Sequence, residues 1–261
     1  MKNITLYLII ILLTAAMVSG QDCYTVLKVK GDVKLERTGK YIAVNDELCS
    51  NDNVLFSDNN CVVVVHSTNK GRFTLKPTKQ NYNELEYYVS DILRQSSNLS
   101  TRGANTLSEE FSGDYCIIGE TKIIIDKLDF PMNENKFFYL SYITGSDTVY
   151  RKIKFFGDTL IIEKEGILKD DVFSSDYLSN VNLYYYDNVN KVSKLINTFN
   201  LNFIHENELK DNLGNYLTIL RKAGRNDYEI KNEFYFYFND IYGKVNKENF
   251  LHWVENNLNL K

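Results

Sequence analysis

The order of the secondary-structure patterns constrains the fold of this chain more than any other feature. Short apolar runs typical of strands come first, and apolar residues at helical spacing follow from Leu209 onward. Strands that are followed by helices, rather than alternating with them, favour an α+β fold over a parallel doubly wound sheet. We therefore expect a small all-β module, then an antiparallel β meander, then a helical C-terminus.

The first twenty residues have the layout of a secretory signal peptide. Lys2 precedes the apolar run Ile4–Met17, and Val18–Gly20 supplies small residues at the cleavage positions. This run is shorter than the roughly 20 apolar residues of a membrane span, and no later run approaches that length. We expect residues 1–20 to be removed, and a mature protein from Gln21 that is periplasmic or secreted and has no membrane span.

Residues 21–77 are predicted to form the β module, because short β-type runs alternate there with Gly, Asn and Asp turns. Four of its segments together resemble the FecR-type periplasmic β domain: Val29–Val33, Val44–Leu48, Asn51–Val54 and Cys61–Val65. Asn45 stands where that family usually has glycine. The resemblance implies a related β module of the bacterial envelope. It does not extend to the family's sigma-factor segment or membrane helix, so it implies no sigma-factor signalling.

Residues 78–106 are predicted to form a helix and a linker. Apolar residues recur at helical spacing over residues 82–95, and the polar stretch that follows has little to bury. Residues 107–261 are predicted to form an α+β domain. Its expected strands are Tyr115–Asp126, Lys136–Ile143, Thr148–Phe156, Thr159–Glu163 and Val181–Tyr186.

Capping residues mark the predicted ends of helices in the C-terminal part of the chain. Gly224 follows an apolar stripe that ends at Leu220, where a C-cap glycine belongs. Asn246 is placed to cap the last helix. The run Glu233–Asp240 fits both a strand and a helix, and we predict a helix because helical segments flank it.

The chain has four cysteines, an even number that permits two disulfides in an exported protein. Cys49 and Cys61 flank a turn-rich stretch, so we predict that these two pair. The alternative is that some cysteines are buried thiols. The cysteine and histidine spacing matches no zinc pattern, and we expect no metal and no cofactor.

The sequence identifies no catalytic residue. Cys61 and His66 are separated by an odd number of positions, so a straight strand would direct them to opposite faces. His205 precedes two glutamates, but acidic residues are common at a helix start for electrostatic reasons. Asp170 and Asp171 could supply half of a carboxylate pair, which leaves an exported hydrolase with a site between the two domains as an alternative.

Clustered aromatic residues are the strongest indication of binding. The candidate surface consists of Tyr87, Tyr88, Tyr184, Tyr185 and Tyr186. Tyrosine suits protein or sugar recognition, because its ring is rigid and its hydroxyl stays in water. The alternative is that alternate rings are part of the core.

The charge balance narrows the possible partners. With 30 basic and 34 acidic side chains the net charge is −4, which excludes neither proteins nor sugars but argues against nucleic acid and anionic lipid. We therefore expect a non-catalytic envelope or secreted protein that binds another macromolecule, either an envelope protein or a glycan.

Overall fold

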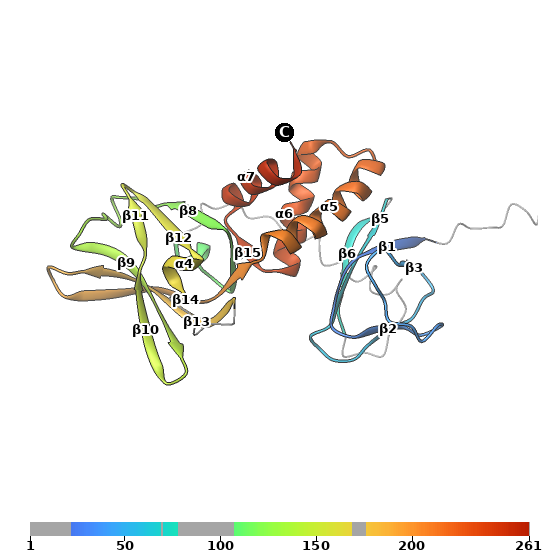
Figure 1. The fold of residues 1–261 in the computed structure, drawn as a ribbon, viewed down its shortest axis with the longest axis horizontal. Coiled ribbons are helices and arrows are strands. Elements are labelled where there is room, and N and C mark those ends of the chain that lie inside the picture. Colours follow the sequence, from blue (N-terminus) through green and yellow to red (C-terminus); the bar gives the residue numbers. More distant parts are fainter. Residues whose placement is uncertain (1–21, 69, 78–106, 169–175, 261) are drawn as a thin grey trace, which may run out of the picture. The chain divides into compact units, whose positions relative to one another are not determined.

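The computed structural model describes residues 22–68, 70–77, 107–168 and 176–260. The chain divides into two compact units, Met1–Ser100 and Thr101–Lys261, which are described separately below (Figure 1). Small antiparallel sheets make up the first unit, and the second contains a mixed, mostly antiparallel sheet, a smaller antiparallel sheet and C-terminal helices. The predicted α+β class is confirmed. The predicted signal peptide and the helix and linker of residues 78–106 lie outside the described residues.

The N-terminal unit is built from short strands. They are β1 (Cys23–Lys30), β2 (Val33–Leu35), β3 (Glu47–Cys49), β4 (Val54–Phe56), β5 (Val62–Ser67) and β6 (Gly71–Leu75). Four of them form an antiparallel sheet in the order β3-β1-β5-β6, and β2 pairs with β4. Val63, Val64 and Val65 of β5 are completely buried, which is why this stretch of the sequence is apolar throughout.

A close approach of the backbone to a side chain requires glycine between β1 and β2. Gly31 has a φ of 78°, and a Cβ atom there would lie 2.5 Å from the Sγ atom of Cys61. Glycine adopts this left-handed conformation without strain, and it has no Cβ atom that would clash with the sulfur. Cys61 itself is completely buried and forms no disulfide.

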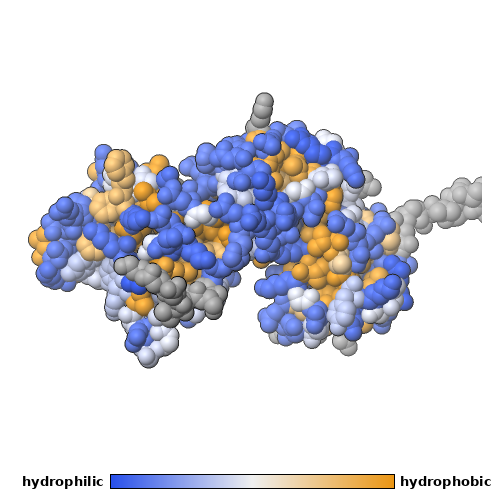
Figure 2. All heavy atoms as spheres, in the orientation of Figure 1, coloured by the Kyte–Doolittle hydropathy of each residue, from blue (hydrophilic) through white to orange (hydrophobic). Residues whose placement is uncertain are grey.

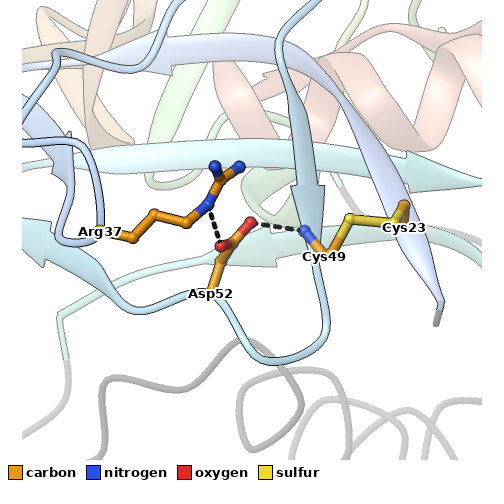
Figure 3. Close-up of a disulfide and its surroundings, with 4 residues drawn as sticks. All are labelled: Cys23, Arg37, Cys49 and Asp52. Carbon is orange, nitrogen blue, oxygen red and sulfur yellow. Dashed lines mark hydrogen bonds and ion pairs between the residues drawn. A yellow bond between two sulfur atoms is a disulfide. The ribbon is translucent and has the colours of Figure 1, made fainter.

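The disulfide in this unit joins Cys23 to Cys49, so the predicted Cys49–Cys61 pairing is wrong (Figure 3). Cys23 and Cys49 lie directly opposite each other in the β1–β3 ladder, with α-carbons 4.0 Å apart. Strand β1 lies between β3 and β5 in the sheet, so two strand spacings, about 10 Å, separate the strand of Cys49 from the one that follows Cys61. A disulfide needs α-carbons within about 7 Å.

A buried carboxylate supports the bridge (Figure 3). The side chain of Asp52 is only 4% exposed. Its carboxylate accepts a hydrogen bond from the backbone N–H of Cys49 at 2.8 Å and another from Nε of Arg37 at 2.5 Å. The bridged end of β3 is thus held by a covalent bond and by a charge-assisted hydrogen bond.

The C-terminal unit contains two sheets. Their strands are β7 (Asp114–Ile118), β8 (Glu120–Ile124), β9 (Lys136–Thr144), β10 (Asp147–Lys152), β11 (Lys154–Phe156), β12 (Thr159–Glu163), β13 (Tyr177–Asp187), β14 (Val192–Ile204) and β15 (Lys244–Val245). The larger sheet has the order β10-β9-β13-β14-β7-β15, and the smaller has the order β11-β12-β8. Gly119, with a φ of 60°, divides the predicted strand Tyr115–Asp126 into β7 and β8.

Helices complete this unit. They are the short α3 (Leu107–Glu110) and α4 (Lys164–Ile167), and the longer α5 (Glu206–Lys222), α6 (Asp227–Ile241) and α7 (Lys247–Leu258). Helix α6 contains the whole of Glu233–Asp240, so the predicted helix is confirmed. Asn226 and Glu229 form a capping box at its start. Asn246 caps α7 through the N–H of Asn249, as predicted. Among the described residues, no helix is both long enough and apolar enough to cross a membrane.

Strand β7 receives both of its neighbours from later parts of the chain. It pairs in parallel with β14 on one side and with β15 on the other, and α5 and α6 connect these two partners. Gly243, just before β15, has a φ of 120°, and a Cβ atom there would lie 2.4 Å from the carbonyl oxygen of Asp114. Only glycine lets the two backbones come this close.

Candidate functional site

Exposed hydrophobic side chains alone do not define a site in this protein. Figure 2 shows one face of the molecule, on which hydrophobic atoms form separate areas between hydrophilic ones. Single exposed hydrophobic residues are normal on soluble proteins, so a candidate site must be argued from residues that lie together.

Five aromatic side chains lie together on the outer face of the larger sheet. Phe137 and Tyr139 come from β9, Tyr150 from β10, and Tyr184 and Tyr186 from β13. In the ladder between β9 and β13, Tyr184 is opposite Tyr139 and Tyr186 is opposite Phe137. The intervening residues of both strands, such as the buried Phe138 and Leu183, point into the core. We call these five residues the aromatic face.

The rings of the aromatic face contact one another across the strands. Tyr139 and Tyr184 stack with their centroids 5.0 Å apart and an interplanar angle of 11°. Phe137 and Tyr186 meet edge to face at 5.4 Å. Tyr150 lies 6.0 Å from Tyr139 and is 63% exposed, while the other four side chains are partly exposed. Each ring thus restricts its neighbour, and the face is ordered before any ligand arrives.

Cations and hydrogen bonds surround these rings. The ammonium group of Lys152 lies 4.1 Å from the centre of the Phe137 ring, a cation–π contact. The hydroxyl of Tyr139 donates to Oγ of Ser193 at 3.1 Å. Below the rings, Asp187 accepts hydrogen bonds in the turn after β13, chiefly from the backbone of Asn190, and these lower the pKa of its carboxyl to about 2. Asp187 is therefore ionised at neutral pH and holds the end of the β13–β14 hairpin.

The structure separates the tyrosines of the predicted surface. Tyr184 and Tyr186 lie on the aromatic face, whereas Tyr185 points to the opposite side. Its ring packs against Phe138 at 5.0 Å, its hydroxyl donates to the carbonyl of Pro131, and burial raises its pKa. Tyr87 and Tyr88 lie outside the described residues.

Sequence reasoning missed Phe137, Tyr139 and Tyr150. The two β9 residues were within a predicted strand, and their spacing of two positions places them on one face. That signal could have joined them to Tyr184 and Tyr186, which have the same spacing. The pairing of β9 with β13 was the missing information, whereas the pairing of β9 with β10 was part of the predicted antiparallel meander.

The thiols and histidines do not form a recognisable catalytic group within the described residues. Burial raises the pKa of the Cys116 thiol to about 12, and its Sγ donates to the carbonyl of Tyr242 at 3.1 Å, so it is protonated at neutral pH. His205 lies 2.6 Å from Asp176, and the described residues contain no cluster of three or more potential metal ligands. Asp170 and Asp171 lie outside the described residues.

Known proteins supply no family for this chain. Comparison with protein-family models, with curated proteins and with solved structures gives no match. The likeness of the N-terminal unit to the FecR-type β domain therefore stays a prediction.

Proposed function

We propose that this chain is an exported, non-catalytic protein that binds another macromolecule through the aromatic face. The observation that carries the proposal is the grouping of five partly exposed aromatic side chains, from three adjacent strands, on one side of a sheet. The Cys23–Cys49 disulfide is compatible with an oxidising compartment. Together with the signal-like first twenty residues, it supports a periplasmic or secreted location.

The ring geometry favours a protein partner over a glycan. A sugar stacks on an open ring face, and the stacking of Tyr139 on Tyr184 leaves fewer ring faces open. The exposed ring of Tyr150 lies next to this pair. These rings, together with the stem of Lys152, suit the centre of a protein–protein interface, where tyrosine is enriched and little side-chain freedom is lost on binding.

The test begins with a photo-crosslinking amino acid at position 150, placed in the mature chain. Crosslinking in the periplasmic or secreted fraction of the source cells identifies the partner, and its affinity is then measured with purified proteins. The double variant Tyr139→Ala/Tyr184→Ala should weaken binding by about 100-fold, since two interface tyrosines typically contribute more than 1 kcal/mol each.

Tyr228→Ala is the matched control, because Tyr228 is 74% exposed on α6 in the same unit. It should leave the affinity unchanged. Equal affinities for the double variant and this control would contradict the proposal, as would a protein that crosslinks to nothing and stays monomeric. Binding to a glycan array that the double variant loses would instead identify a glycan as the partner.

A further inference from the structure

A groove elsewhere in the C-terminal unit exposes the edge of a sheet. The groove has a volume of about 1100 Å³, and five consecutive residues, Lys122–Asp126, line it. Successive side chains of a strand point to opposite faces, so five consecutive residues can line one groove only if the backbone edge faces it. These residues cover the end of β8, which is the outer strand of the order β11-β12-β8.

One residue already occupies part of this edge in the manner of a neighbouring strand. The side-chain amide of Asn249, in the first turn of α7, accepts a hydrogen bond from the backbone N–H of Lys122 at 3.0 Å. The same amide donates to the backbone carbonyl of Lys122 at 2.8 Å. Asn246 fixes the amide by accepting a further hydrogen bond from it. Asn249 thus shows where the next strand of the sheet would run.

The edge continues into the groove beyond Lys122. In an antiparallel ladder, every second residue directs both its N–H and its C=O to the same side. Ile124 therefore presents both groups on the side of Asn249, and the N–H of Asp126 follows. The intervening Ile125 donates in the other direction, to the carbonyl of Asp158 at 2.8 Å. The side chain of Ile124 is 75% exposed at this place.

The charges of the groove indicate which charge a molecule that binds there would carry. Its lining includes the carboxylates of Glu110, Asp126, Asp129 and Glu248, against the ammonium groups of Lys122 and Lys194. Lys122 is paired with Glu120 at 2.7 Å, and Lys194 lies over the Phe130 ring. The groove is therefore acidic, with apolar side chains between the charges, among them Ile124, Phe130, Leu195 and Ile196.

We propose that an extended peptide segment of another protein, with alternating apolar and basic residues, adds as a strand to the edge of β8. Its backbone would pair with Ile124 and Asp126, its apolar residues would contact the side chain of Ile124, and its basic residues would face the groove carboxylates. This site is separate from the aromatic face and does not depend on it.

The test uses the mature chain and a fluorescently labelled peptide of about eight alternating valines and lysines, long enough to span the exposed edge. Fluorescence anisotropy should show saturable binding. Ile124→Pro removes only an N–H that points away from β12, and proline is tolerated on edge strands. It should bind the peptide at least about tenfold more weakly than Ile124→Ala, which keeps this donor.

Two further measurements do not depend on the folding of the proline variant. A peptide methylated on every backbone nitrogen should not bind the wild-type chain, since it has no N–H left to donate from either edge. Glu248→Gln/Asp129→Asn should weaken binding of the lysine peptide several-fold and leave a valine–glutamine peptide unaffected. Undiminished binding of the methylated peptide, equal affinities for Ile124→Pro and Ile124→Ala, or no binding of the lysine peptide would each overturn the proposal.

Discussion

Removal of the Cys23–Cys49 bridge should destabilise the N-terminal unit and leave the C-terminal unit unchanged. The two cysteines are 26 positions apart in the sequence. In the chain-entropy model, a disulfide that closes a loop of this length lowers the conformational entropy of the unfolded chain. This stabilises the folded state by about 3.5 kcal/mol. The variant Cys23→Ser/Cys49→Ser removes the bond without creating new thiols, and both positions are only partly buried, so serine fits there.

The two free cysteines report on the two units separately. Cys61 and Cys116 are both completely buried, one in each unit, so an alkylating reagent reaches each thiol only when its own unit opens. When closing is faster than labelling, the labelling rate follows the population of the open state. Peptide mass spectrometry after timed alkylation therefore measures both stabilities in one sample.

A loss of about 3.5 kcal/mol corresponds to an increase of about 300-fold in the labelling rate of Cys61. The rate of Cys116 should stay as in the wild-type chain, because the units are compact bodies with their own cores. An increase of less than about tenfold at Cys61 would refute the loop-entropy argument. An equal increase at Cys116 would show instead that the units unfold together.

Three other changes have defined outcomes. Gly31→Ala should lower the free energy of unfolding, measured in urea, by at least about 2 kcal/mol more than the control Gly39→Ala does. Both positions have a positive φ, but only the Cβ atom added at position 31 would meet Cys61. Asp52→Ala should lower the free energy of unfolding by about 2–3 kcal/mol, because a buried acceptor of two hydrogen bonds is lost. The pKa of Cys116 is raised from 9.0 to about 12 by burial, so its protonated thiol contributes stability below pH 9 that is lost as the pH rises to 12. The stability of Cys116→Ala should therefore fall less steeply over that range than that of the wild-type chain.

Local signals in the sequence predicted the helical part of the fold. The predicted cap at Asn246 acts over three residues, and so does the cap at Asn226, which was not predicted, so the pattern that starts each helix is local. The same is true of Gly224, whose φ of 75° follows the last turn of α5. These elements depend little on the rest of the chain.

The order of strands depends on distant parts of the chain and was not predictable in this way. The disulfide was assigned to the wrong partner because nothing near Cys49 or Cys61 shows that β1 lies between their strands. Strand β14 was not predicted at all, although the buried Phe199, Leu201 and Phe203 alternate with asparagines in its second half. The aromatic face combines three strands, so only its β13 members were identified from the sequence.

The position of β7 has a consequence for how the chain matures during synthesis. Translation proceeds from the N-terminus, yet β7 finds its two partners only in β14 and β15, and Cys116 bonds to a carbonyl 126 residues later. Until the ribosome has released Lys244 and Val245, one edge of an apolar strand has no partner within the sheet. Such late closure slows folding and exposes the nascent chain to aggregation. We expect the C-terminal unit to be the part of this protein that most needs a chaperone.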